Sequence, residues 1–210
     1  MASGFQIARR TPVSLCGASL AVCLLVPGSG FAAPLGLPEN TAKIGYGMGA
    51  ANVAIDDPDG STRDNWAAQP FNLIYTDWLL RDIRQWTELY YFKAALDADA
   101  TNVGQNVQSY GIRFSLQKNY RVSPSWSPWF GAGIEVANSH YDTRHTKDAD
   151  GFLLQSFDDR QETNVAFLIN MLSEWSVQKD WTIGAKLEQS IPSGGGIAEF
   201  AAAVTVLYRY

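Results

Sequence analysis

The last residues of the chain, Glu199-Phe-Ala-Ala-Ala-Val-Thr-Val-Leu-Tyr-Arg-Tyr210, alternate in character from one position to the next. The even-numbered positions are apolar and include Phe200, Tyr208 and Tyr210, whereas the odd-numbered positions are mostly small or charged. A period of two indicates a β-strand, because successive side chains of a strand point to opposite faces. One apolar face and one small or charged face fit a strand between lipid and a narrow polar lumen.

The same alternation recurs upstream, over residues 44–50, 109–117, 130–137, 164–171 and 181–188. Two further strands are expected near 70–80 and 85–97, where aromatic residues and threonine are enriched. Apolar residues are consecutive there, so the inward faces of these two strands are not assigned, and a helix over 77–92 is an alternative. The sequence therefore predicts an all-β fold, an eight-stranded antiparallel up-and-down transmembrane β-barrel.

The connections between the expected strands alternate in length. Short ones are expected near 81–84, 121–127 and 178–180. Long polar ones are expected at 55–69, 98–106, 142–161 and 191–196. Outer-membrane barrels have short periplasmic turns and longer external loops, so the long connections are expected on the outer side of the membrane.

The N-terminal segment, residues 1–32, is predicted to be a cleaved signal peptide. Two arginines precede an apolar run over 13–26 that is too short to span a bilayer as a helix. Small residues at Gly30 and Ala32 place the cleavage after Ala32, which leaves 33–210 as the barrel domain. Both cysteines lie in the segment that is removed, so the barrel domain has no disulfide and no thiolate ligand.

The charge of the barrel domain argues against nucleic acid as a partner. Residues 1–32 hold two of the 16 basic residues and none of the 21 acidic residues, so the barrel domain has a formal net charge of −7. A chain with this acidic balance lacks the basic surface that phosphate groups require.

A water-soluble barrel of the lipocalin type also shows alternation and follows a signal peptide, but its apolar faces point inward. Three features favour the membrane barrel: the terminal aromatic residue, the small or ionisable character of the minor face, and aromatic residues at strand ends that suit the membrane interface. The aromatic residues in question are Tyr46, Trp129, Phe130, Trp181, Tyr208 and Tyr210.

Two segments resemble the OmpA-like, OmpX-like and opacity-type outer-membrane barrels. Pro128-Trp-Phe-Gly-Ala-Gly-Ile-Glu-Val-Ala137 is similar to their Pro-aromatic-aromatic-Gly-x-Gly strand, and Val204-Thr-Val-Leu-Tyr-Arg-Tyr210 is similar to their closing strand. The resemblance implies insertion into the outer membrane of a Gram-negative bacterium by the assembly machinery, with Val206, Tyr208 and Tyr210 as the assembly signal. Outer-membrane lipid and lipopolysaccharide are then expected partners, and the external ligand stays open.

Six ionisable residues on the minor faces are predicted to point into the lumen. They are Arg113, Glu135, Lys186, Glu188, Glu199 and Arg209. The interior of an eight-stranded barrel is only wide enough for side chains, and a buried charge without a partner costs several kcal/mol. We therefore expect a network of ion pairs and hydrogen bonds that plugs the lumen, with a narrow pore or a buried active site as the alternative.

No catalytic residue, metal site or cofactor is assigned. His140 and His145 would face opposite sides of a continuous strand. Ser139, His140 and Asp142 are too close in sequence to converge easily as a catalytic triad. Lipid A deacylases, whose barrels resemble this one in size, carry a His-x-Ser-Asn motif on a late strand, and no histidine follows His145.

The leading functional hypothesis is a non-enzymatic barrel with a structural or surface-interaction role, which presents its long loops on a rigid scaffold. The alternatives are an outer-membrane lipid-modifying enzyme, a narrow porin-like channel, and a soluble lipocalin-like binder.

Overall fold

The computed structural model describes residues 41–56, 62–123, 126–194 and 196–210. The predicted signal peptide, residues 1–32, and the first residues of the predicted barrel domain lie outside these described residues. Among the described residues, no helix has the length and apolar character needed to cross a membrane.

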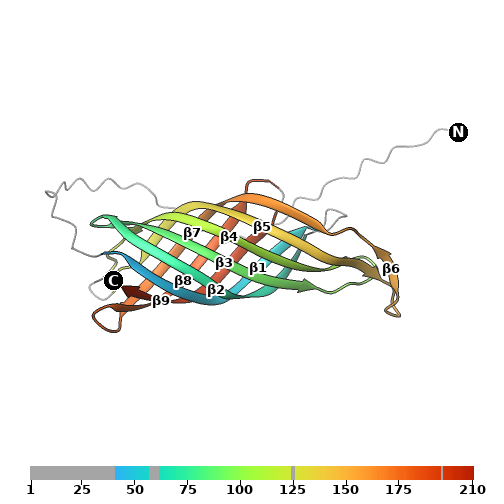
Figure 1. Cartoon of the computed structure of the whole chain (residues 1–210), viewed down its shortest axis with the longest axis horizontal. Coiled ribbons are helices and arrows are strands. Elements are labelled where there is room, and N and C mark those ends of the chain that lie inside the picture. Colours follow the sequence, from blue (N-terminus) through green and yellow to red (C-terminus); the bar gives the residue numbers. More distant parts are fainter. Residues whose placement is uncertain (1–40, 57–61, 124–125, 195) are drawn as a thin grey trace. The chain divides into compact units, whose positions relative to one another are not determined.

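The described part of the chain folds into nine antiparallel strands (Figure 1). The strands are β1 Lys43–Asp56, β2 Thr62–Leu80, β3 Ile83–Leu96, β4 Gly104–Asn119, β5 Trp129–Lys147, β6 Leu153–Ser156, β7 Arg160–Ser176, β8 Trp181–Pro192 and β9 Ala198–Arg209. Eight of them form a closed ring, in which β1 pairs with β9 and β5 pairs with β7. The short β6 pairs only with the end of β5. The predicted eight-stranded antiparallel barrel is therefore confirmed.

The two faces of each strand separate as the alternation predicts. On β9, Ala203 and Leu207 are buried in the lumen, whereas Val204 and Tyr208 are exposed on the outer surface. Large apolar side chains stay exposed on every strand of the ring, which in a closed barrel is the surface that lipid covers. A lipocalin-type barrel would have its apolar faces inside, so the outer surface argues against that alternative.

The barrel has two different ends. The turn end carries the connections 81–82, 120–128 and 177–180, together with the start of β1 and the end of β9. The opposite end is called the ribbon end, because β5 and β6 extend from it as a two-stranded ribbon, drawn at the right of Figure 1.

The strands extend further at the ribbon end than predicted, so the expected contrast in loop length is weak. The region 142–161 was expected to be a loop, yet β5 continues to Lys147, β6 covers Leu153–Ser156 and β7 begins at Arg160. Both faces of β5 are polar from Asp142 onward, so the hydrophobic alternation fades there while the backbone pairing continues. Of the predicted loop at 55–69, residues 57–61 lie outside the described part of the chain.

The region that was difficult to interpret from sequence forms a hairpin and not a helix. β2 ends at Leu80 and β3 begins at Ile83, with these two residues paired. Pairing of β2 with β3 is interrupted by a bulge between Ala68 and Phe71. Pro70 lies inside this bulge, where its lack of a backbone N–H costs no ladder bond. The bulge places Gln69 in the lumen, although Phe71, two positions later, is exposed.

Candidate functional site

A cluster of charged side chains fills the lumen near the middle of the barrel. At its centre, the Arg113 guanidinium on β4 forms ion pairs with carboxylates from four other strands, the longest being 3.8 Å to Glu88 Oε1 on β3. Its Nε lies 2.6 Å from Glu135 Oε2 on β5, and its NH1 lies 2.7 Å from Glu188 Oε1 on β8. Its NH2 lies 2.7 Å from Glu199 Oε1 on β9. The Arg113 side chain is completely buried, so these carboxylates supply the stabilisation that water would otherwise provide.

Lys186 on β8 is the second buried cation of this cluster. Its Nζ donates to Glu88 Oε2 at 2.5 Å and to Glu188 Oε1 at 3.1 Å. Trp86 Nε1 also donates to Glu88 Oε2, at 3.0 Å. The cluster therefore links strands on opposite sides of the barrel, because β3 and β8 are not neighbours in the ring.

Uncharged groups complete the cluster. Ser190 Oγ donates to Glu135 Oε1 at 3.1 Å, and Gln69 Nε2 donates to Glu199. The guanidinium carbon of Arg113 lies over the ring of Tyr90, 3.6 Å from the ring centroid. Such a contact between a desolvated cation and an aromatic face is favourable by about 2 kcal/mol.

Apolar layers lie on either side of the charged cluster. The layer toward the ribbon end contains Ala51, Val53, Ile55, Ala67, Phe92, Val107, Tyr141, Ile197 and Ala201. The layer toward the turn end contains Ile74, Trp86, Trp129, Leu172 and Leu207. Arg84 lies against the second layer, 4.0 Å from the Trp129 ring, and pairs with Glu174 at 2.8 Å. Side chains therefore plug the barrel on both sides of its charged middle.

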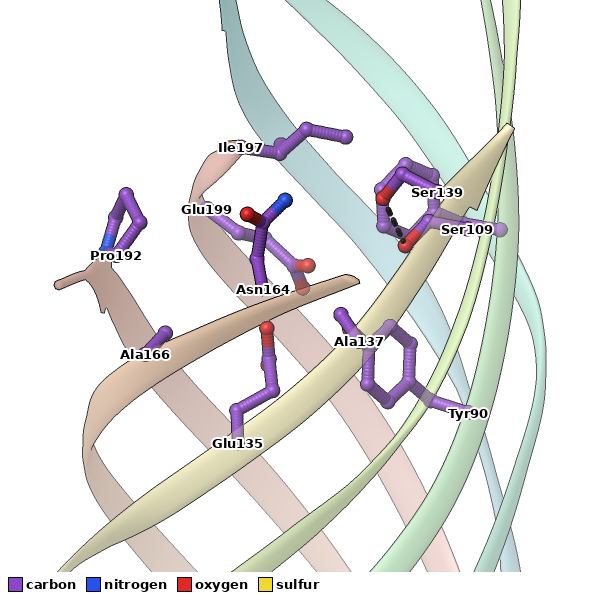
Figure 2. A pocket seen from close by; sticks show the side chains of 11 residues that line it. Tyr90, Ser109, Glu135, Ala137, Ser139, Asn164, Ala166, Pro192, Ile197 and Glu199 are labelled. Carbon is purple, nitrogen blue, oxygen red and sulfur yellow. Dashed lines mark hydrogen bonds between the residues drawn. The ribbon is translucent and has the colours of Figure 1, made fainter. Parts of the chain in front are cut away.

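A small cavity lies on the ribbon side of the cluster (Figure 2). Its volume is about 10 Å³, close to the minimum that one water molecule needs. Its walls include the carboxylates of Glu135 and Glu199 and the hydroxyls of Ser109 and Ser139. A space of this size suits a single small occupant and not a substrate.

Five of the six predicted lumen residues meet in this cluster: Arg113, Glu135, Lys186, Glu188 and Glu199. Arg209 does not meet them. It lies at the turn end of β9, with its side chain 40% exposed and its NH2 3.3 Å from Asp180 Oδ1. Its position at the end of a strand places it at the rim and away from the packed interior.

Sequence reasoning missed Glu88, the partner of Lys186. The run Tyr90, Tyr91 and Phe92 concealed the alternation of β3, so no inward face was assigned. The structure pairs Glu88 with Arg113 across the β3–β4 ladder. The sequence did contain a signal for this face. Every second residue of β3 points inward, and these residues include Arg84, Trp86, Glu88 and Tyr90.

The residues of the predicted assembly signal lie on the outer surface. Val206, Tyr208 and Tyr210 are all exposed. The ring of Tyr208 contacts that of Trp181 on the neighbouring β8, with centroids 5.0 Å apart. Their role in assembly stays a prediction.

The serine and histidines of β5 do not form a catalytic group. Ser139 is buried in the lumen, where its hydroxyl bonds that of Ser109 at 3.1 Å. His140 and Asp142 belong to the opposite face of the strand, and Asp142 accepts a hydrogen bond from Asn106 at 3.0 Å. His145 Nδ1 lies 2.6 Å from the carbonyl oxygen of Thr143. No group of three possible metal ligands of the His, Cys, Asp or Glu type occurs within the described ranges.

The second candidate site is the β5–β6 ribbon, defined here as residues 142–159. Its tip exposes three consecutive large apolar side chains: Phe152 is 71% exposed, Leu153 64% and Leu154 57%. The turn before them is ordered by Asp148, whose Oδ1 accepts from the backbone N–H of Asp150 at 3.0 Å and of Phe152 at 2.8 Å.

The ribbon is held to the barrel at its base but has one open edge. The Lys147 N–H donates to the Asp99 carbonyl of the β3–β4 connection at 3.1 Å, and Arg144 Nε donates to Gln105 Oε1 on β4 at 3.3 Å. In the described sheet, β6 has a neighbour on one side only, β5. The ribbon therefore combines an unpaired backbone edge with an exposed apolar tip.

Comparison with known proteins supports the fold. No protein-family model and no curated protein matches the sequence. The solved structure of Ail, the attachment invasion locus protein of Yersinia pestis, is similar, with a TM-score of 0.50 and 12% identity over 80% of this chain and 99% of that chain. Neisserial surface protein A is also similar, with a TM-score of 0.51 and 12% identity over 81% of this chain and 97% of that chain. The chain thus has the fold of the small eight-stranded outer-membrane β-barrels.

Proposed function

We propose that this protein is a non-enzymatic outer-membrane barrel that binds an external partner through its β5–β6 ribbon. The observation that carries the proposal is the row Phe152, Leu153 and Leu154, which is exposed on an ordered turn. Large apolar side chains that lie next to one another on a water-exposed surface mark interaction sites. The ribbon is attached to a closed barrel, which holds it as a rigid scaffold holds a functional loop.

The location in the membrane is part of the proposal. The exposed apolar outer surface suits lipid, and both similar structures are barrels of the same architecture. With short turns facing the periplasm, the ribbon end is external and meets lipopolysaccharide. Export by the signal peptide 1–32 and insertion by the assembly machinery, guided by Val206, Tyr208 and Tyr210, complete this assignment.

The lumen supports a structural role. Its charged side chains pair with one another across the barrel, and apolar layers cover them on both sides. A channel would need a continuous polar path through the lumen, whereas the space beside Glu135 holds about one water molecule. The barrel therefore acts as the anchor, and the ribbon as the binding element.

The chemistry of the ribbon points to an extended peptide segment as the partner. The open edge of β6 presents backbone donors and acceptors that a further strand can pair with. The adjacent apolar side chains offer packing for alternate residues of that strand. Asp148, Asp150, Asp158 and Asp159 flank β6 in the sequence, so a strand that carries lysine or arginine is favoured.

A synthetic peptide of alternating lysine and valine tests the proposal. The full-length mature protein is refolded in lipid nanodiscs, and binding is measured by fluorescence anisotropy. The double variant Phe152→Ser/Leu154→Ser lacks two of the exposed apolar side chains. It is expected to bind the peptide at least about tenfold more weakly, or ~1.4 kcal/mol. The control is Val122→Ser, because Val122 is 59% exposed but lies at the turn end. This variant is expected to bind the peptide as the wild type does.

Two outcomes would contradict the proposal. One is equal binding by the ribbon variant and the control. The other is equal binding of a peptide in which glutamate replaces lysine, because that peptide would be repelled by the ribbon's aspartates.

A further inference from the structure

The buried cluster contains more negative than positive groups. Its carboxylates and cations are Glu88, Glu135, Glu188, Glu199, Arg113 and Lys186. With every group ionised, four negative charges face two positive ones. An uncompensated charge inside a protein is unfavourable by several kcal/mol, so such a cluster takes up positive charge from solution.

The excess charge is localised on one side of the cluster. Glu88 and Glu188 lie between both cations: Lys186 Nζ is 2.5 and 3.1 Å from them, and Arg113 NH1 is 3.8 and 2.7 Å from them. These four groups balance in charge. The ion pairs of Glu135 and Glu199 in the described structure are both made with Arg113.

Glu135 and Glu199 also share the cavity. Both line the space of about 10 Å³, and Figure 2 shows their carboxylate groups reaching into the same region below Asn164. Two buried carboxylates that share one site cannot both ionise without a large cost, and one proton between them removes it.

Gln69 supplies an independent indication. Its side chain is completely buried, and its Oε1 has no hydrogen-bond partner among the described residues. Its Nε2 donates to Glu199, which suits an ionised carboxylate. Rotating the side-chain amide by 180° presents Oε1 to Glu199 instead, which suits a protonated carboxyl group. The two amide orientations occupy almost the same space.

We propose that Glu135 and Glu199 form a proton-binding site that holds one exchangeable proton beside the lumen cavity. The proton comes from water and bonds to a carboxylate oxygen of one of the two residues, and no other bond changes. When it leaves, two negative charges again face each other in the lumen, one from β5 and one from β9. The barrel is therefore most stable with the proton bound and loses stability as the pH rises and the proton departs.

The groups around this site come from all the strands of the ring. β4 provides Arg113, β2 provides Gln69, β3 provides Glu88 and Tyr90, and β8 provides Lys186, Glu188 and Ser190. β7 contributes Asn164 and Asn170, and β1 contributes Ala51 and Val53, none of which is charged. Arg113 is the cation that contacts Glu135 and Glu199, and it is shared with Glu188. Lys186 contacts Glu88 and Glu188 instead.

Infrared spectroscopy of the refolded barrel tests the proposal directly. The wild-type protein is expected to show, at neutral pH, the carbonyl stretch of a protonated carboxyl group that shifts in heavy water. Raising the pH removes this band and lowers the unfolding midpoint in urea. Glu199→Gln and Glu135→Gln each remove the band and the decline in midpoint, because a neutral amide replaces the protonated group.

Glu162→Gln serves as the control, because Glu162 lies outside the cluster near the ribbon end. Its carboxylate accepts hydrogen bonds from the Tyr141 hydroxyl and from Arg160 Nε. It is expected to keep both the band and the decline. Absence of the band in the wild type, or its survival in both lumen variants, would overturn the proposal. So would a midpoint that depends on sodium or potassium concentration with no band, because a metal cation would then balance the cluster. If a lumen variant fails to fold, the wild-type band and its loss at high pH still decide the question.

Discussion

Arg113 and Glu135 are paired directly across the β4–β5 ladder, and their side chains meet in the lumen with Arg113 Nε 2.6 Å from Glu135 Oε2. The neighbouring strands thus position the first contact of the cluster, and the closure of the ring brings Glu188 and Glu199 to the same guanidinium. Together with its longer contact to Glu88, one arginine therefore connects β4 to four other strands.

The first prediction follows from that role. Arg113→Met keeps much of the side-chain volume but leaves Glu135, Glu188 and Glu199 without their shared cation. We expect the free energy of unfolding to fall by about 3–5 kcal/mol, the usual loss when one partner of a buried ion pair is removed. Urea unfolding of the barrel refolded in lipid vesicles, followed by tryptophan fluorescence, measures the change.

The matched control for this change is Arg160→Met. Arg160 also pairs with a glutamate, Glu162, but its side chain is 41% exposed near the ribbon end. An exposed ion pair contributes at most about 1 kcal/mol. Similar losses in the two variants would show that the buried cluster has no special share in stability.

The alternation of residues predicted the ring of strands because the membrane imposes it. Within the bilayer the outer face must be apolar, as Phe200 and Val204 are on β9, so each strand shows its two faces in the sequence. Beyond the bilayer both faces meet water, and the constraint ends. The end of β5, from Asp142 to Lys147, is polar on both faces, so its sequence predicts a loop where the structure has a strand.

Alternation also determines which lumen residues can be predicted from the sequence. In strands with regular apolar and polar alternation, the pattern predicted that Lys186 and Glu199 lie on the inner face. The pattern failed for Glu88, because consecutive aromatic residues hide the alternation of β3. It also failed for Arg209, which is at an inward-facing position of the alternation but lies at the rim. Which carboxylate reaches which cation depends on the stagger of the strands around the ring, and no residue pattern carries that information.

The second prediction concerns the order of the ribbon. Asp148→Ala removes the acceptor for the backbone N–H groups of Asp150 and Phe152. We expect faster amide hydrogen exchange at Phe152 and weaker binding of the lysine–valine peptide, although Phe152, Leu153 and Leu154 are all still present. The loss of such a capping interaction costs about 0.5–2 kcal/mol locally.

Asp150→Ala separates this effect from charge. It removes the same negative charge two positions away but keeps the Asp148 carboxylate that orders the turn. We expect slow exchange at Phe152 to be preserved. If both variants weakened binding equally with unchanged exchange, charge and not turn order would be responsible.

The third prediction tests the assembly signal. Tyr210 follows the last residue of β9 and is 59% exposed, so Tyr210→Ser is expected to leave the stability of the refolded barrel almost unchanged. If Tyr210 is read during assembly, the same variant accumulates less folded barrel in the outer membrane of living cells. Heat-modifiability gels of the membrane fraction measure this amount.

Tyr120→Ser is the control for the assembly test, because Tyr120 is also an exposed tyrosine at the turn end but lies in the β4–β5 connection. It is expected to reach normal levels in the membrane. Equal accumulation of the two variants and the wild type would remove Tyr210 from the assembly signal.

The fourth prediction concerns the pH dependence of the β3–β4 connection at the ribbon end. The Asp99 carboxylate accepts hydrogen bonds from the Asn102 side chain, from the backbone N–H groups of Thr101 and Asn102 at 2.7 and 2.8 Å, and from the Thr101 hydroxyl at 2.9 Å. These bonds hold the pKa of Asp99 well below its ordinary value of 3.8. Because the pKa is lower in the folded connection, the resulting stabilisation is present above pH 3.8 and is lost as the pH falls through the lowered pKa.

Nuclear magnetic resonance of the amide groups of Thr101 and Asn102 follows this titration in the refolded protein. We expect both resonances to stay constant from neutral pH to below pH 3.8 and to shift only when the pH reaches the lowered pKa of Asp99. Asp99→Asn removes the titrating group while its side-chain oxygen can still accept hydrogen bonds, so the amide shifts of this variant are expected to lose their pH dependence. A midpoint at the ordinary value in the wild type would mean that the connection is not closed around Asp99, because a carboxylate without those donors titrates like a free one.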